Sequence, residues 1–127
     1  MLKSFTVANF KAFEKAVTLD FSATGHYEFQ PEVIQDTIVK TAIMYGKNAS
    51  GKSSLAIGLF DIVGNLTDKY ANISEYKNYT NIFHVDNPAE FEYRFRFQNK
   101  EVIYLRISIF LFIVLLLPYT ENIILPI

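Results

Sequence analysis

The chain has 127 residues, no cysteine and a formal net charge of -1 at pH 7. This length suits a single domain that can bury a core, and the lack of cysteine excludes disulfides and thiolate metal sites. The near-zero charge excludes bulk attraction to nucleic acid or to anionic lipid. Because the N-terminus also lacks the long apolar run of a secretion signal, we expect a cytoplasmic protein.

The first part of the chain is predicted to contain three strands. Residues 2–10 and 16–22 carry β-branched and aromatic residues and are predicted to be strands separated by a turn. Residues 23–32 contain glycine, proline and polar residues, which predict a loop. Residues 41–45 are a short apolar run ending at a glycine, which is typical of a buried strand in a parallel or mixed sheet.

A helix is predicted to begin near Gly51 and to end near Gly64 and Asn65. Apolar residues recur there at three- and four-residue spacing, which is the period of an amphipathic helix. The stripe consists of Leu55, Leu59, Ile62 and Leu66, widened by Phe60 and Val63. Residues 67–81 are polar and rich in tyrosine, which predicts a loop or a short helix.

Residues 89–107 predict a hairpin, since apolar and charged residues alternate strictly up to a turn near Gln98. One face of the first strand carries Phe91, Tyr93, Phe95 and Phe97, and the other carries Glu90, Glu92, Arg94 and Arg96. The aromatic face should pack on a core. The charged face fits a salt-bridged, solvated surface better than a metal site. Together the elements predict an α/β or α+β fold with a mixed sheet, a strand–loop–helix unit at residues 41–66 and antiparallel hairpins.

The stretch "YGKNASGKSS" contains a complete phosphate-binding pattern, Gly46-x-x-x-x-Gly51-Lys52-Ser53. Glycines at both ends allow backbone angles at which successive amide groups turn inward as an anion nest. The helix that follows would add its free N–H groups and its positive dipole end. The alternative is a chance glycine-rich turn, but the apolar run before the stretch and the helix after it favour a nucleotide site.

Each residue of this loop has an expected part in binding a nucleotide. Lys52 would reach the β- and γ-phosphates, the Ser53 hydroxyl would ligate Mg²⁺, and Ser54 would lie near the α-phosphate. The backbone cradle would be made by Gly46, Lys47, Asn48, Ala49, Ser50 and Gly51. The sequence therefore predicts binding of ATP with Mg²⁺.

The N-terminal part of the chain resembles ABC-type ATPases of the SMC/RecF branch, including OLD-type nuclease ATPases and other phage-defence ATPases of the AAA family. The resemblance rests on the loop "YGKNASGKSSL" and on "NFKAF" at residues 9–13, and it covers residues 1–106. It implies an N-terminal ATP-binding lobe that works as a homodimer or with the remaining half of an ATPase, with DNA or an effector nuclease as further partners. It also implies that Lys11 lies near the phosphates, the alternative being a solvated turn lysine. Phe10 and Phe13 are better explained as core residues than as adenine contacts.

Relatives of this kind also carry a signature motif beginning Leu-Ser-x-Gly and a Walker B strand ending in Asp-Glu, and neither occurs in this sequence. No catalytic residue is therefore assigned, and the isolated chain is expected to bind ATP without useful hydrolysis. The alternative is a non-catalytic interaction or membrane-associated module in which the loop is a relic.

Residues 107–127 form a strongly apolar tail whose one charge is Glu121. The uninterrupted run is too short for a membrane span, and Pro118 and Pro126 interrupt its continuation. We expect a truncated or out-of-frame segment, with a buried element of the domain and a membrane anchor as the alternatives.

Overall fold

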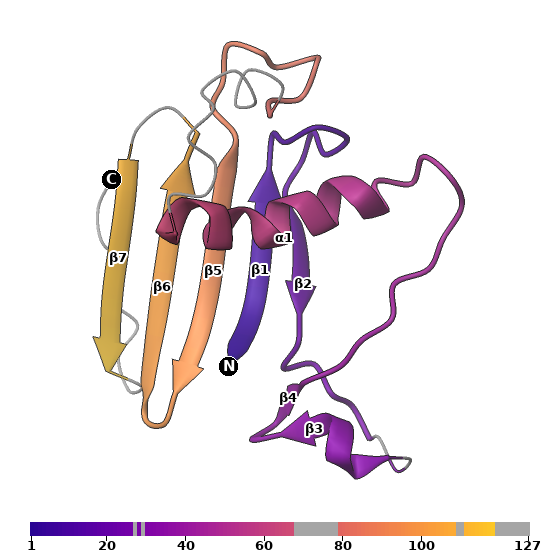
Figure 1. Ribbon diagram of the computed structural model, residues 1–127, viewed down its shortest axis with the longest axis vertical. Coiled ribbons are helices and arrows are strands. Elements are labelled where there is room, and N and C mark those ends of the chain that lie inside the picture. Colours follow the sequence, from indigo (N-terminus) through magenta and orange to yellow (C-terminus); the bar gives the residue numbers. More distant parts are fainter. Residues whose placement is uncertain (27, 29, 68–78, 109–110, 119–127) are drawn as a thin grey trace.

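The computed structural model describes all residues except 27, 29, 68–78, 109–110 and 119–127. It has two layers, a five-stranded sheet and a helix that runs across one face of it (Figure 1). The strands are β1 (Leu2–Ala8), β2 (Val17–Asp20), β5 (Glu90–Phe97), β6 (Lys100–Ile107) and β7 (Leu111–Pro118). Their order is β2-β1-β5-β6-β7, and every pairing is antiparallel. The α+β class is confirmed, but the described strands form no mixed sheet.

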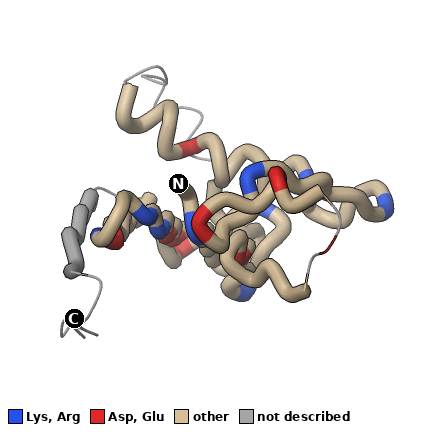
Figure 2. The backbone as a smooth tube through the Cα atoms, turned by 90° about the horizontal axis from the view of Figure 1, so that it is seen from below, with Lys and Arg blue, Asp and Glu red and all other residues tan. Residues whose placement is uncertain are grey.

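The helix α1 (Lys52–Leu66) lies on one side of the sheet and forms the second layer (Figure 2). Aromatic side chains at every second position of the strands point toward it, with the ring centroids of Phe5 and Tyr93 4.9 Å apart. The helix approaches closely because Gly58 faces the sheet, where a Cβ atom would lie 3.2 Å from the Phe5 ring. The core consists of Phe5, Val7, Phe10, Leu55, Ala89, Phe91, Tyr93 and Tyr104.

A second, two-stranded sheet lies at the end of the main sheet where the chain begins (Figure 1). After the 3-10 helix η1 (Pro31–Val33), the strands β3 (Ile34–Gln35) and β4 (Ile38–Val39) pair across a two-residue turn. Both turn residues, Asp36 and Thr37, have positive φ, as tight hairpin turns of this length require. The sequence does not predict this hairpin, because its strands are too short to show alternation.

The face of the main sheet that points away from α1 carries ion pairs. Lys3 Nζ lies 3.2 Å from a carboxylate oxygen of Glu101, and Arg94 contacts both Glu92 and Glu101. This confirms the prediction of a salt-bridged face. The turn at Gln98 is also confirmed, since Gln98 has φ 53° between β5 and β6.

The buried strand predicted at residues 41–45 is wrong. These residues belong to no strand, and they are part of the connection from β4 to α1 that runs outside both sheets (Figure 1). The side chains of Ile43 and Tyr45 are 89% and 91% exposed. An apolar run indicates a preference for burial but does not show which element would cover it. No described strand pairs with this segment.

The apolar tail contributes β7, which pairs with β6 from Ile107 and Leu111 to Lys100 and Pro118. The sheet thus continues past residue 106, where the sequence predicts the ATP-binding lobe to end. Residues 119–127, and most of the predicted loop or short helix at 67–81, lie outside the described residues. The truncated or out-of-frame origin of the tail remains a prediction.

Candidate functional site

The glycine-rich loop lies between the exposed connection and the first turn of α1. Two of its residues adopt left-handed backbone angles, Ala49 with φ 60° and Gly51 with φ 88°. Left-handed residues that alternate with right-handed ones can turn successive amide groups toward one side, as they do in anion nests. Residues 46–50 are all exposed, so the loop is accessible to a ligand from solvent.

The side chain of Lys52 folds back into this loop. Its Nζ donates to the carbonyl oxygens of Gly46 and Lys47, at 2.8 and 2.6 Å, and lies 3.3 Å from Ser50 Oγ. All three acceptors are neutral, and no carboxylate of the described residues forms an ion pair with Lys52. The ammonium charge is therefore fixed within the loop without a neutralising partner.

The N-terminus of α1 adds further hydrogen-bond donors. Gly51 is the N-cap residue, and no side chain caps the helix. Leu55 N donates to Gly51 O at 2.9 Å, so the amide groups of the preceding turn have no acceptor within the helix. These amides and the helix dipole favour an anion at the same end of α1 where Lys52 lies.

The fit of Mg²⁺ to the site depends on Ser53, whose side chain is exposed at the start of α1. No group of three or more acidic or histidine side chains in the described part of the chain could hold a metal ion. Mg²⁺ commonly takes one or two protein ligands and completes its shell with waters and substrate phosphates. A single serine hydroxyl therefore suits an ion that arrives bound to a nucleotide. It would not hold a metal ion by itself.

The segment "NFKAF" contacts the loop through its second half. A Cβ atom on Gly51 would lie 2.9 Å from Phe13 Cζ and 3.6 Å from Ala12 Cβ, so this turn supports the end of the loop. Phe10 is fully buried in the core, as predicted, and Phe13 packs partly buried against it. Lys11 Nζ lies 5.9 and 5.8 Å from the ring centroids of Phe10 and Tyr79. The structure thus places the Lys11 ammonium over two aromatic rings, and its predicted contact with phosphate remains a prediction.

Two buried asparagines hold this turn, and neither contact was predicted from the sequence. Asn9 Nδ2 donates to the carbonyl oxygens of His84, Asn87 and Pro88 at 3.0, 2.7 and 3.2 Å. Asn81 Nδ2 donates to Lys11 O at 2.8 Å. The turn beside the loop is therefore anchored to the segment before β5. Asn9, the first residue of "NFKAF", could have indicated such a contact, since a short amide side chain readily hydrogen-bonds to backbone groups.

Asp61, in α1, and Glu14, next to the "NFKAF" segment, each pair with another side chain. Asp61 of α1 forms a buried ion pair with Arg106, and Glu14 lies 3.0 Å from His84 Nε2. The hydrogen bond to His84 lowers the pKa of the Glu14 carboxyl group. Within the described residues no carboxylate is hydrogen-bonded to Lys52, whose partners are two carbonyl oxygens and a hydroxyl group.

The structure is thus that of an α+β protein with an exposed loop, bounded by Gly46 and Gly51, at the start of its helix. No protein-family model matches the chain, and no curated protein matches it. Among the described helices, none has the length and apolar character needed to cross a bilayer.

Proposed function

We propose that the chain binds the phosphates of ATP through residues 46–54. The observation that carries the proposal is the loop wrapped around the ammonium group of Lys52 at an uncapped helix N-terminus. On binding, phosphate oxygens replace the loop carbonyls as partners of Lys52. The backbone amides of Gly46 to Gly51 cradle the β-phosphate, while Ser53 ligates the Mg²⁺ of the nucleotide and Ser54 lies near the α-phosphate.

Binding of labelled ATP by wild type and by Lys52→Ala tests this proposal. A charge-assisted hydrogen bond is worth about 1.5–3 kcal/mol, so we expect Lys52→Ala to bind about ten- to a hundredfold more weakly. Lys47→Ala is the matched control, because it removes an equal charge from the same loop but keeps the Lys47 carbonyl. Equal affinity of wild type and Lys52→Ala would sink the assignment.

We further propose that the chain is the N-terminal lobe of a larger ABC-type assembly. Support comes from apolar surface that this chain leaves uncovered on α1, at Ile57, Phe60, Val63 and Leu66, and on the preceding connection, at Ile43, Met44 and Tyr45. Exposed apolar patches on soluble proteins commonly mark sites where a partner binds. A second copy or the remaining half of the ATPase would cover it and supply the groups that hydrolysis needs.

Phosphate release by the isolated chain tests the second proposal. Once ATP binding has been established, we expect no turnover above background, because no described carboxylate is placed to activate water. Turnover that disappears in Lys52→Ala would show that this chain is a complete hydrolase.

A further inference from the structure

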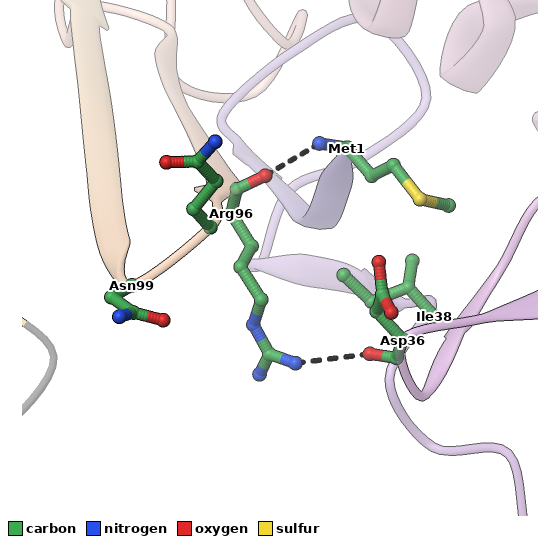
Figure 3. A pocket seen from close by; sticks show the side chains of 6 residues that line it. Met1, Asp36, Ile38, Arg96 and Asn99 are labelled. Carbon is green, nitrogen blue, oxygen red and sulfur yellow. Dashed lines mark hydrogen bonds between the residues drawn. The ribbon is translucent and has the colours of Figure 1, made fainter.

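Two pockets that share Met1 as a lining residue lie where the small sheet meets the main one. In the first, between the β3–β4 turn and the β5–β6 turn, Arg96 Nη1 donates to Asp36 O at 3.1 Å and to Thr37 Oγ1 at 3.2 Å (Figure 3). The second, which we call the Lys40 pocket, has a volume of about 360 Å³, within the usual range of small-molecule sites. Its lining residues are Met1, Leu2, Phe21, Gln35, Val39 and Lys40.

Backbone hydrogen bonds hold the walls of the Lys40 pocket in place. Phe21 N donates to Lys3 O at 2.9 Å, which ties the residue after β2 to β1. Val39 N donates to Phe21 O at 2.8 Å, which joins the small sheet to the same residue. Lys40 N donates to Val33 O at 2.7 Å, so the backbone that carries the Lys40 side chain is also fixed. The pocket is therefore a part of the fold and not a gap between independent segments.

Most of the lining of the Lys40 pocket is apolar. The apolar side chains come from the start of β1, from the residue after β2 and from β4, and each of them is only partly buried; they are Met1, Leu2, Phe21 and Val39. Water in the pocket therefore contacts apolar surface, and an apolar ligand group that displaced this water would be stabilised. Among the lining residues, Gln35 and Lys40 are the polar ones, and both are exposed.

Two residues of the lining carry a positive charge. Lys40 Nζ forms no hydrogen bond or ion pair with any described residue. The N-terminal ammonium of Met1 is engaged, since it donates to Arg96 O at 2.6 Å, and the Met1 side chain extends away from Arg96 (Figure 3). The Lys40 ammonium is thus the charged group available to a ligand, and the Met1 ammonium adds charge of the same sign.

None of the described residues that line the Lys40 pocket is acidic. Of the acids nearest in sequence, Asp20 accepts hydrogen bonds from the amide and the hydroxyl group of Ser22, at 2.8 and 2.6 Å. Asp36 follows Gln35 and lines the first pocket instead. The lining therefore combines an apolar wall with a net positive charge, which favours a ligand that is apolar and anionic.

We propose that the Lys40 pocket binds a small carboxylic acid with an unbranched apolar chain. The chain would lie among Leu2, Phe21 and Val39, and the carboxylate would meet the Lys40 ammonium group in a charge-assisted hydrogen bond. A neutral apolar molecule would leave the Lys40 charge without a partner, and an apolar amine would be repelled by it. The proposal is independent of nucleotide binding, because no residue of 46–54 lines this pocket.

An NMR titration of the whole chain with hexanoate at neutral pH tests the proposal. We expect saturable shifts centred on residues 1–2, 21 and 39–40. Acetate, which lacks the apolar chain, should bind at least about tenfold more weakly. Hexanamide, the neutral counterpart of similar shape, should bind about two- to fivefold more weakly, since an ion pair with an exposed lysine contributes little. Hexylamine, which carries the opposite charge, should bind more weakly than hexanamide.

The Lys40→Gln variant isolates the contribution of the charge. We expect it to bind hexanoate and hexanamide equally, while Lys15→Gln, which removes an exposed lysine that does not line the pocket, keeps the preference for hexanoate. Lys52→Ala should bind hexanoate like wild type, which separates failure here from failure of the nucleotide proposal. The absence of saturable binding by hexanoate would overturn the proposal. So would equal binding of hexanoate and acetate, equal binding of hexanoate and hexylamine, or an unchanged preference in Lys40→Gln.

Discussion

Asp61 of α1 and Arg106 of β6 form an ion pair inside the protein, and their side chains are 2% and 4% exposed. Asn65 Nδ2 donates to the same Asp61 oxygen at 2.8 Å, and the Arg106 guanidinium lies 5.3 Å from the Phe91 ring centroid. Burial lowers the pKa of Arg106 to about 10, so the guanidinium remains charged at neutral pH. This pair joins α1, which follows the glycine-rich loop, to β6, the second strand of the hairpin.

Removing one partner of this pair should be far more damaging than removing both. Asp61→Asn leaves the Arg106 charge buried without a counter-charge, and we expect a loss of about 3–5 kcal/mol in the free energy of unfolding. The free energy of unfolding of the double variant Asp61→Leu/Arg106→Leu should be within about 1–2 kcal/mol of the wild-type value, or higher, because this variant buries no charge. Urea unfolding of both variants provides the measurement. A loss below about 1 kcal/mol in Asp61→Asn would mean that the pair is open to solvent.

Tyr93 should make the stability of the protein fall in alkaline solution. Its hydroxyl group donates to Gly58 O at 2.6 Å in the core, and burial raises its pKa above the ordinary value of 10.0. The unfolded chain therefore releases this proton at lower pH than the folded chain does. The stability due to the neutral hydroxyl is fully present below pH 10 and is lost as the pH rises further.

Urea unfolding of wild type and Tyr93→Phe at pH 7 and at pH 11 tests this linkage. At pH 7 we expect the variant to be less stable by about 1 kcal/mol, since it lacks the hydrogen bond. By pH 11 wild type should lose about 1.4 kcal/mol that the variant does not lose, so the difference should vanish or reverse. The other tyrosines are common to both proteins and cancel. A difference that is constant with pH would contradict burial of this hydroxyl group.

Replacing Gly46 or Gly51 of the glycine-rich loop by alanine should affect stability differently. At Gly51 a Cβ atom would meet the Phe13 ring at 2.9 Å, and φ is 88°, so Gly51→Ala should lower the unfolding free energy by about 2 kcal/mol or more. At Gly46 the contact is with the movable Ser50 hydroxyl at 3.2 Å, and φ is not positive. Gly46→Ala should therefore stay within about 0.5 kcal/mol of wild type.

A second background separates the two causes at Gly51. In Phe13→Leu the ring contact is removed and the backbone strain remains, so Gly51→Ala should still destabilise that protein, by about 1 kcal/mol. Thermal or urea unfolding of the four proteins gives both contributions. If Gly51→Ala had no effect in either background, the left-handed conformation at this residue would be disproved.

The elements that were predicted well from the sequence are those whose apolar pattern shows which face packs against the rest of the chain. The predicted hairpin at residues 89–107 matches the bounds of β5 and β6 closely, and the predicted helix after Gly51 matches those of α1. The predicted apolar stripe of the helix is wrong at Phe60, Val63 and Leu66, which are exposed. The failure at residues 41–45 has the opposite cause, since an apolar run predicts burial whether or not a covering layer is present. Contacts between distant residues also escaped prediction, because Asp61 and Arg106, or Asn9 and Pro88, become neighbours only when the sheet forms.

The same limit explains what was missed at the candidate sites. The loop at residues 46–54 could be proposed as a phosphate site from the sequence because its nine residues are consecutive and their spacing has chemical meaning. The pocket between the β3–β4 turn and the β5–β6 turn could not be predicted, since it is formed by two turns about sixty residues apart, at Asp36 and Gln98 (Figure 3). Neither turn contains a glycine, which would have indicated left-handed backbone.

The two sides of α1 should differ sharply in their contribution to stability. Leu55 is 6% exposed and belongs to the core, so Leu55→Ala should lower the unfolding free energy by about 2–4 kcal/mol. Phe60 is 64% exposed on the other side, and Phe60→Ala should change it by less than about 0.5 kcal/mol although a larger side chain is removed.

The outer side of α1 should instead govern association. Phe60→Ser should reduce self-association of the isolated chain in sedimentation experiments, because it interrupts the exposed apolar surface. If Phe60→Ala destabilised the monomer as much as Leu55→Ala, another part of this chain would have to cover that side of the helix. The proposal of an outside partner would then lose its support. If Phe60→Ser changed neither self-association nor stability, the surface responsible for association would lie elsewhere. The exposed residues Ile43 and Tyr45 would then be the next candidates.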